Sequence, residues 1–252
     1  LVIFGCSQRS LLYFPSNEII DISNHNDTGL KEVELTTSDG LVLKSWFKEP
    51  NTPKGFTILI FHGNAGHIGD RVEKFKRFID AGYGLLFLEY RGYGGNPGRP
   101  SEKGLYSDAN AALNFLSKQH ISSYKIILYG ESLGCGIAAK LSSEQIFAAT
   151  ILEAPYTSIA DVAQRHYWFL PAKWLVLDRY KILEIINNIK SPLMVIHGEQ
   201  DNVINIEFGK QVFDAAPEPK EALFIPNAGH NNLYDFYADK KILVYLDKQL
   251  NF

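Results

Sequence analysis

The chain has 252 residues, a formal net charge of −3 and 46% hydrophobic residues, values that are ordinary for a globular protein. The slightly acidic balance and the lack of a basic run argue against nucleic acid as a partner, because polyanion binding depends on clustered Lys and Arg side chains. Only two cysteines are present, Cys6 and Cys135, which excludes a disulfide-rich scaffold and a four-cysteine zinc site.

The N-terminal residues 1–7 are mostly apolar and include Cys6. No methionine starts the chain, so we expect a processed or truncated product. The segment resembles the end of a bacterial lipoprotein signal, in which the cysteine is acylated and anchors the protein in the cell envelope. The alternative is an apolar stretch that packs on the domain of a cytoplasmic protein, and both interpretations stay open. No stretch approaches the roughly 20 apolar residues that a membrane-spanning helix needs.

The first expected elements form a hairpin. Residues 33–37 and 41–47 alternate between apolar and polar with period two on either side of Ser-Asp-Gly at 38–40, a pattern typical of two antiparallel strands. Residues 56–61 are almost all apolar and predict a strand that is buried on both faces. Apolar residues at helical spacing then predict a helix over 70–81, ended by a glycine.

Beyond this point, apolar runs alternate with segments of helical periodicity to the end of the chain. The expected strands cover residues 85–88, 126–129, 148–152, 193–196 and 222–225. The expected helices cover residues 102–119, 136–141, 206–215 and 236–249.

Strands separated by single helices predict right-handed crossovers, and therefore an α/β fold with a mainly parallel, doubly wound sheet that is covered on both faces. The N-terminal hairpin would extend one edge of this sheet in antiparallel fashion. No internal repeat or low-complexity segment interrupts the pattern. We expect residues 30–252 to form a single catalytic domain, preceded by an N-terminal segment at residues 1–29.

Residues 130–134 read Gly-Glu-Ser-Leu-Gly and lie between the expected strand at 126–129 and the expected helix at 136–141. A G-x-S-x-G pattern between a strand and a helix is typical of a nucleophile elbow, a sharp turn that projects the serine hydroxyl above the edge of the sheet. Glycine on both sides permits the close approach of strand and helix. The pattern therefore predicts that Ser132 is a nucleophile.

Two further residues of matching chemistry, Asp201 and His230, each follow an expected strand. In doubly wound sheets, groups at the carboxyl ends of parallel strands meet at one edge. A serine hydroxyl needs an imidazole to remove its proton, and the imidazole needs a carboxylate to fix its tautomer. We therefore expect Ser132, Asp201 and His230 to form a catalytic triad, with Glu199 as the competing acid.

Acyl transfer also needs donors for the oxyanion that develops. The backbone N–H of Leu133 is one expected donor, because it begins the helix with its amide unpaired. The second is expected from the loop at residues 62–66, with the backbone N–H of Asn64 as the choice and that of Ala65 as the substitute. His62 in the same loop is expected to brace the loop rather than to act as a base or metal ligand.

No cofactor or metal is expected. The glycine-rich residues 91–98 lack the Lys-Ser/Thr ending of a phosphate-binding loop, so they predict a close passage of the chain near the active-site floor. The remaining histidines considered are interpreted as surface or packing residues: His67, His120, His166 and His197.

Several stretches of the chain resemble the α/β-hydrolase superfamily, and the resemblance covers nearly the whole chain from about Leu30 onward. The stretches His-Gly-Asn-Ala-Gly at 62–66, Arg-Gly-Tyr-Gly at 91–94 and Leu-Leu-Tyr-Phe-Pro at 11–15 are similar to one branch of it. That branch holds small, nearly lidless α/β-hydrolase-domain proteins, some of them protein depalmitoylases, and bacterial relatives described as serine aminopeptidase-like hydrolases.

The resemblance implies the α/β-hydrolase fold and carries the family's catalytic triad onto Ser132, Asp201 and His230. It likewise implies that the backbone amides of Asn64 and Leu133 form the oxyanion hole. No triad position is substituted in this sequence. One scaffold hosts many chemistries, so the resemblance does not identify a substrate.

Residues 156–190 are inserted where larger relatives carry a lid. About 35 residues suffice for two short helices but not for a full cap domain. Aromatic and aliphatic side chains are dense at 166–171 and 174–177. Two interpretations stay open: ordinary packing of the insert on the core, or an acyl-chain or membrane-facing rim that would support peripheral membrane association.

The sequence thus predicts a serine hydrolase that cleaves a carboxylic ester or thioester through an acyl-enzyme on Ser132, acting on a small-molecule or acyl-group substrate. One alternative is an aminopeptidase-like amide hydrolase, in which an acidic pair such as Glu153 and Asp161 would recognise a free amino terminus. A non-catalytic binding protein on the same fold is the other alternative. The oligomeric state and acyl-chain length are not predicted.

Overall fold

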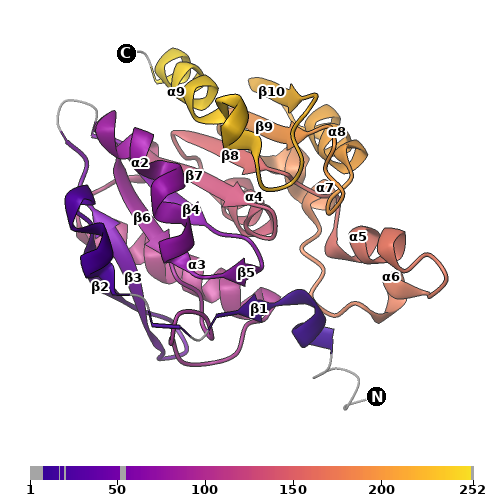
Figure 1. Cartoon of the computed structure of the whole chain (residues 1–252), viewed down its shortest axis with the longest axis horizontal. Coiled ribbons are helices and arrows are strands. Elements are labelled where there is room, and N and C mark those ends of the chain that lie inside the picture. The colour runs from indigo at the N-terminus through magenta and orange to yellow at the C-terminus, as the bar shows by residue number, and fades with distance from the viewer. Residues whose placement is uncertain (1–7, 17, 20, 52–54, 251–252) are drawn as a thin grey trace.

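The computed structural model of the chain describes residues 8–16, 18–19, 21–51 and 55–250. Residues 1–7 lie outside the described residues, so the predicted lipidation of Cys6 stays a prediction. One eight-stranded sheet runs through the molecule with helices on both sides (Figure 1). No helix within the described ranges is both long and apolar enough to cross a bilayer.

The sheet has the strand order β10-β9-β8-β7-β4-β6-β3-β2. Strands β2 and β3 pair antiparallel at one edge, β3 joins β6 antiparallel, and the strands from β6 to β10 pair in parallel. The predicted fold class, an α/β-hydrolase fold with an antiparallel hairpin at the edge, is therefore confirmed. The strands are β1 (Phe14–Pro15), β2 (Lys31–Thr36), β3 (Val42–Lys48), β4 (Thr57–Phe61), β5 (Ala65–Gly66), β6 (Gly84–Leu88), β7 (Ile126–Glu131), β8 (Ala149–Glu153), β9 (Leu193–Gly198) and β10 (Lys220–Ile225).

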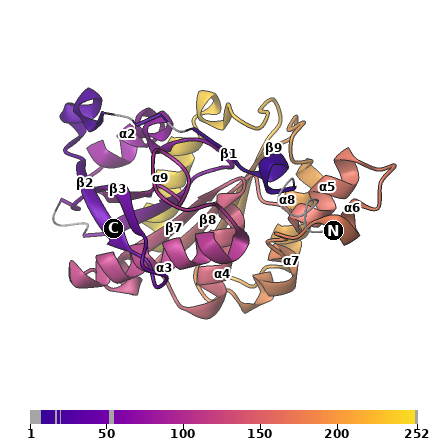
Figure 2. The ribbon, with the colours of Figure 1, turned by 90° about the horizontal axis from the view of Figure 1, so that it is seen from below.

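Helices cover both faces of the sheet, and each face has its own apolar core. Helices α2 and α9 pack on one face, and α3, α4 and α8 pack on the other (Figure 2). The helices are α2 (Val72–Asp80), α3 (Glu102–Lys118), α4 (Gly134–Glu144), α5 (Ile159–His166), α6 (Ala172–Leu175), α7 (Ile182–Ile185), α8 (Ile206–Ala215) and α9 (Ala238–Gln249), with 3-10 helices η1 (Ile22–Thr28), η2 (Ile68–Arg71), η3 (Ser123–Lys125), η4 (Ile186–Asn188) and η5 (Leu233–Phe236).

Most expected elements are confirmed, with shifts at their ends. The helix expected over 70–81 begins with the 3-10 helix η2 and continues as α2, and the chain leaves it through Gly82 at a φ of +88°. The insert holds three short helices, α5, α6 and α7, followed by η4. Pro171 directly precedes α6, and the missing amide of proline is tolerated at such a helix start. The two-residue pairing of β1 with β5 has no counterpart in the sequence pattern.

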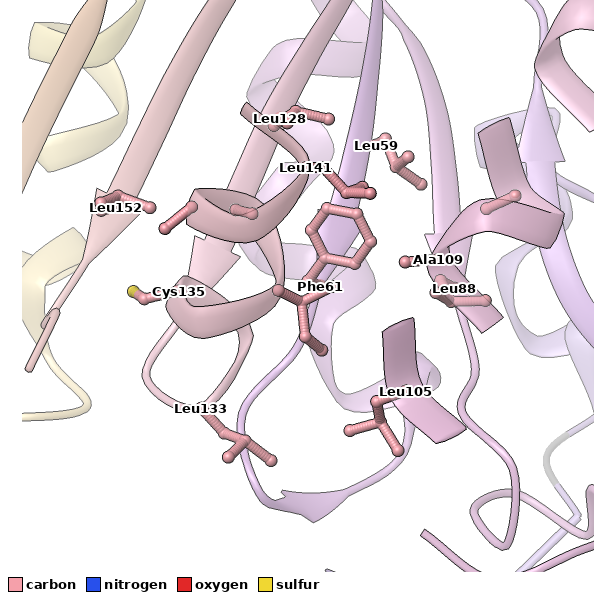
Figure 3. Packing of buried hydrophobic residues seen from close by; sticks show 14 of the residues in the cluster. Leu59, Phe61, Leu88, Leu105, Ala109, Leu128, Leu133, Cys135, Leu141 and Leu152 are labelled. Atoms are coloured by element: carbon pink, nitrogen blue, oxygen red, sulfur yellow. The ribbon is translucent and has the colours of Figure 1, made fainter. Parts of the chain in front are cut away.

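Helix α4 crosses β4 closely enough to exclude any side chain at Gly134. A Cβ at Gly134 would lie 2.0 Å from the carbonyl oxygen of Phe61, and one at Gly130 would lie 2.6 Å from the carbonyl oxygen of Gly134. Figure 3 shows the apolar side chains around this crossing, among them Phe61 from β4, Leu133 and Leu141. The two glycines of the G-x-S-x-G pattern are therefore required by backbone packing.

Replacing Gly134 with Ala should lower the free energy of unfolding by about 3 kcal/mol, because the new methyl group forces α4 away from β4. Urea unfolding measures this loss. Gly229→Ala is the matched control, since a Cβ there makes only ordinary contacts, at 3.6 Å from Asn232 and 3.7 Å from Gln200. A control variant as unstable as Gly134→Ala would contradict the packing argument.

Candidate active site

Ser132 lies in the turn between β7 and α4 and adopts a left-handed backbone conformation, with a φ of +51°. Residues other than glycine rarely adopt this region, and here neighbouring segments fix it. The Ser132 N–H donates to the carbonyl of Glu153 at 2.8 Å, and its carbonyl accepts from Cys135 at 2.9 Å. Strand β8 and helix α4 thus hold the strained turn that the sequence predicted.

The structure brings the three side chains of the predicted triad into one hydrogen-bonded chain. His230 Nε2 lies 3.2 Å from Ser132 Oγ, and His230 Nδ1 lies 2.6 Å from Asp201 Oδ2. With the proton on Nδ1 donated to the carboxylate, Nε2 is left to accept the serine hydroxyl proton. Glu199 is exposed, and in the described part of the chain no hydrogen bond joins its side chain to His230. Asp201 therefore has the geometry of the acid.

Asp201 is held as a carboxylate. Burial alone would raise the pKa of Asp201, but hydrogen bonds from His197 and His230 outweigh burial and keep this pKa well below its usual range. The second carboxylate oxygen accepts from the backbone N–H groups of Val203 at 2.8 Å and Ile204 at 2.7 Å. The negative charge that faces the imidazole is thus present at neutral pH and fixed in orientation.

His197 is a second imidazole at this carboxylate, and the sequence interpretation treated it only as a surface or packing residue. It is fully buried, its Nε2 donates to the carbonyl of Ile204 at 2.8 Å, and the same nitrogen lies 3.3 Å from Asp201 Oδ2. A Cβ at Gly209 would lie 2.2 Å from His197 Nδ1, so α8 packs directly on this ring. The sequence did offer one sign of this role, because His197 is a polar residue near the carboxyl end of an otherwise apolar strand, β9.

Two backbone amides beside Ser132 are free to bind an oxyanion. Within the described ranges, the N–H groups of Leu133 and Asn64 donate to no protein acceptor. Both residues line the same cavity as Ser132, whereas Ala65, the substitute considered for Asn64, is not part of that lining. The arrangement suits the predicted pair of donors.

The N-terminal segment fixes the conformation of Asn64. Its carbonyl accepts from the Phe14 N–H and the Tyr93 hydroxyl, both at 2.8 Å, and its side-chain amide donates to the carbonyl of Leu12 at 2.9 Å. His62 braces the same loop as expected: it is buried, and its Nε2 lies 3.2 Å from Glu89 Oε1.

The N-terminal segment also holds the insert. Arg9 Nε donates to Asp178 Oδ2 at 2.8 Å, and the Tyr13 hydroxyl lies 3.2 Å from the same oxygen. The Tyr13 hydroxyl is also 3.0 Å from that of Tyr180. Residues before the sheet thereby connect the insert to the loop that carries Asn64.

A cavity of about 680 Å³ lies beside Ser132. Its wall is mostly apolar and comes from the N-terminal segment, the insert and the loop after β9, with Leu12, Val162, Leu170 and Leu175 among the contributors. The volume lies within the range of small-molecule sites, and the lining suits an aliphatic group.

The glycine-rich loop after β6 has a structural role. The Arg91 guanidinium is bound by two carboxylates, Asp39 and Asp108, each with a nitrogen–oxygen distance of 2.7 Å. Tyr93 of this loop donates from its hydroxyl to the Asn64 carbonyl, whereas none of residues 91–98 lines the cavity beside Ser132.

A network of buried and half-buried charges lies under the serine turn. Lys74 on α2 contacts Glu131 at 2.8 Å and Glu153 at 2.7 Å, and Arg71 lies 3.3 Å from Glu131. Burial alone would raise the pKa of Glu131, but Lys74 and Arg71 outweigh burial and lower it. Glu153 also accepts from the Tyr129 hydroxyl. The network ties α2 to the ends of β7 and β8 and supports Ser132 from below.

Comparison with known proteins finds a family profile, related sequences and related folds. The family profile described as serine aminopeptidase, S33, matches residues 52–179. An uncharacterized protein of Mycobacterium tuberculosis, Rv2307c, is 38% identical over 227 residues, which cover 89% of this chain and 81% of that protein. The lysophosphatidylserine lipase ABHD12 of Danio rerio is 33% identical over 195 residues, 69% of this chain and 51% of the relative, so the match spans about half of that protein. The esterase Pf2001 of Pyrococcus furiosus shares the fold, with a TM-score of 0.74 at 19% identity over 94% of this chain and 98% of that one.

Replacing Glu131 with Gln should lower the free energy of unfolding by about 2 kcal/mol at pH 7, because the half-buried Lys74 ammonium loses one of its two carboxylates. The pKa of Glu131 is lowered in the folded protein, so the stabilisation is present above the ordinary value of 4.5 and is lost as the pH falls through the folded value. Urea unfolding of both proteins at neutral pH and at about pH 3 should show a smaller difference at the lower pH.

The matched control is Glu221→Gln. Glu221 pairs with Lys248 at 3.3 Å on the surface, where such a pair contributes less than about 1 kcal/mol. Equal losses in the two variants, or a loss in Glu131→Gln that does not change with pH, would show that the charge network under the serine turn adds no stability of its own.

Proposed function

The chain belongs to the serine aminopeptidase S33 family of the α/β-hydrolase superfamily, and from this premise we propose that it is a serine hydrolase that cleaves carboxylic esters or thioesters through an acyl-enzyme on Ser132. The observation that carries the proposal is the hydrogen-bonded chain from Ser132 through His230 to Asp201, placed beside two free amides and an apolar cavity.

In the first half-reaction, Ser132 Oγ attacks the acyl carbonyl while His230 Nε2 takes the hydroxyl proton. The carbonyl oxygen becomes an oxyanion, which the backbone N–H groups of Leu133 and Asn64 stabilise. Asp201 stabilises the imidazolium without taking its proton. When the tetrahedral intermediate collapses, the bond to the leaving oxygen or sulfur breaks, and His230 returns the proton to that atom.

In the second half-reaction, water replaces the leaving group. His230 removes a proton from the water as its oxygen attacks the acyl carbon on Ser132, and the same two amides stabilise the second oxyanion. Collapse breaks the ester bond to Ser132 Oγ, which recovers its proton from His230. The products are a carboxylic acid and the free enzyme.

The lining of the cavity supports an acyl chain as the group that is bound. Leu12, Val162, Leu170 and Leu175 present aliphatic surface next to Ser132, where the acyl part of an ester would lie. A relative described as a lysophosphatidylserine lipase is in line with a lipid-derived acyl group. We therefore propose esters or thioesters of medium or long acyl chains as substrates.

The alternative of an aminopeptidase-like amide hydrolase receives less support from the structure. The acidic pair considered for binding a free amino terminus is used elsewhere, because Glu153 contacts Lys74 below the sheet edge and Asp161 contacts Lys173 at 2.6 Å. Neither carboxylate lines the cavity beside Ser132. A side-by-side assay with p-nitrophenyl esters and aminoacyl-naphthylamides separates the two, and turnover of the amides alone would favour the aminopeptidase.

A fluorophosphonate probe should label the wild-type protein on Ser132, and Ser132→Ala should abolish the label, because only an activated serine reacts with it. Asp201→Asn should lower kcat for ester hydrolysis by roughly 10³-fold or more, since the imidazole then takes the wrong tautomer. Mass spectrometry of the labelled peptide and ester kinetics measure the two effects.

Glu199→Gln is the matched control and should keep nearly full activity. Equal labelling of Ser132→Ala would refute Ser132 as the nucleophile, and an active Asp201→Asn with an inactive Glu199→Gln would transfer the role of the acid to Glu199. A wild-type protein that is folded but never labelled would support a non-catalytic binding protein.

Ala163→Phe should shorten the acyl chains that the protein accepts. Ala163 lines the cavity from α5, so an aromatic ring there occupies the space of an aliphatic chain. We expect kcat/KM for palmitate esters to fall by roughly tenfold or more, with butyrate esters nearly unchanged. Unaltered Ser132 labelling reports an intact site, and an equal loss for both ester lengths would place the acyl chain elsewhere.

A further inference from the structure

The insert has an inner and an outer apolar face. Tyr167, Leu170 and Leu175 line the cavity beside Ser132, whereas the neighbouring Trp168 and Trp174 are not part of that lining. Figure 1 shows that α5, α6 and the loop between them project away from the sheet. The side chains of Trp168 and Trp174 therefore lie outside the cavity wall and do not fill the cavity.

The outer face is exposed to solvent to an unusual degree. Trp168 is 79% exposed, Trp174 is 84% exposed, and Phe169 is 65% exposed. We call these three residues the aromatic patch. The patch contradicts ordinary packing on the core, one of the two interpretations that the sequence left open, at least for these side chains. The rings of Trp168 and Phe169 are in contact, with centroids 5.9 Å apart, and exposed apolar surface of this kind marks an interaction site.

Basic side chains lie next to the patch along the chain. Between the acids Asp161 and Asp178, the charged residues are Arg165 and Lys173, and Asp178 is itself bound by Arg9. Lys173 pairs with Asp161 from the preceding turn, and Arg165 is exposed. Tryptophan rings next to basic side chains are typical of protein surfaces that sit at the headgroup level of an anionic bilayer.

We propose that the aromatic patch docks the protein on the surface of an anionic phospholipid bilayer. Trp168, Phe169 and Trp174 enter the interface, while Arg165 and Lys173 face the headgroups. This inference rests on the proposed function, because the same turn carries Tyr167 and Leu170 on the cavity wall and so brings the mouth of the acyl site to the lipid from which an acyl substrate comes.

Vesicle binding of the Ser132→Ala protein tests the proposal without hydrolysis of the lipid. The chain has three tryptophans, and Trp46 is only 4% exposed, so a change in tryptophan emission reports on Trp168 and Trp174. We expect a blue shift and co-sedimentation with phosphatidylcholine vesicles that contain phosphatidylglycerol, and weaker binding to phosphatidylcholine alone.

The variant Trp168→Ser with Trp174→Ser should weaken vesicle binding by roughly tenfold or more, because two interfacial rings are lost. On the Ser132 background it should keep its fold, and with Ser132 intact it should hydrolyse soluble butyrate esters at the wild-type rate. The matched control is Tyr124→Ser with Val244→Ser, two apolar residues that are 66% and 69% exposed on other elements. That control should bind vesicles like the parent protein.

Three results would overturn the proposal. The first is absence of vesicle binding by the parent protein, and the second is equal binding by the double-tryptophan variant. The third is self-association of the parent protein in light scattering that the variant abolishes, because the patch would then be an interface between copies of the chain. Each is independent of Ser132 labelling, so loss of docking and loss of the proposed hydrolase function are read separately.

Discussion

The backbone contact between Gly134 and the carbonyl of Phe61 is the constraint on which the site depends. Because no side chain fits there, α4 lies directly on β4, and the turn after β7 comes next to the loop after β4. Ser132, in its left-handed conformation, lies directly before this helix, and both free amides flank it. On the opposite face of the sheet, Lys74 ties α2 to the same strand ends. The serine is thus positioned by two layers of the fold.

The strands of the eight-stranded sheet and the three residues of the hydrogen-bonded chain could be predicted from the sequence for one physical reason. Ser132, Asp201 and His230 each follow a strand whose apolar run is strong, and parallel strands carry such ends to one edge of a sheet. The local sequence pattern was therefore enough to predict that these three residues, distant in the sequence, meet in the fold. The choice of Asp201 over Glu199 rested on position alone, and the structure supplies the exposure and hydrogen bonds that separate them.

Other parts of the site depend on contacts that no local pattern encodes. The position of His197 against Asp201 follows from how α8 packs on β9, and the hold of Leu12 on Asn64 joins residues 52 positions apart. Apolar composition also could not tell which aromatic side chains of the insert face inward. Tyr167 and Trp168 are adjacent in the sequence, yet only Tyr167 lines the cavity. Periodicity is uninformative in helices as short as α6, which has four residues.

The N-terminal tie has a consequence for redesign of this scaffold. Arg9 and Tyr13 fasten Asp178, while Leu12 and Phe14 fasten Asn64, so the insert that lines the cavity beside Ser132 and the loop that carries Asn64 are mechanically linked. An insert taken from a relative would lack the N-terminal residues that hold it in that relative. We therefore expect an exchanged insert to keep its position only when residues 8–15 are exchanged with it.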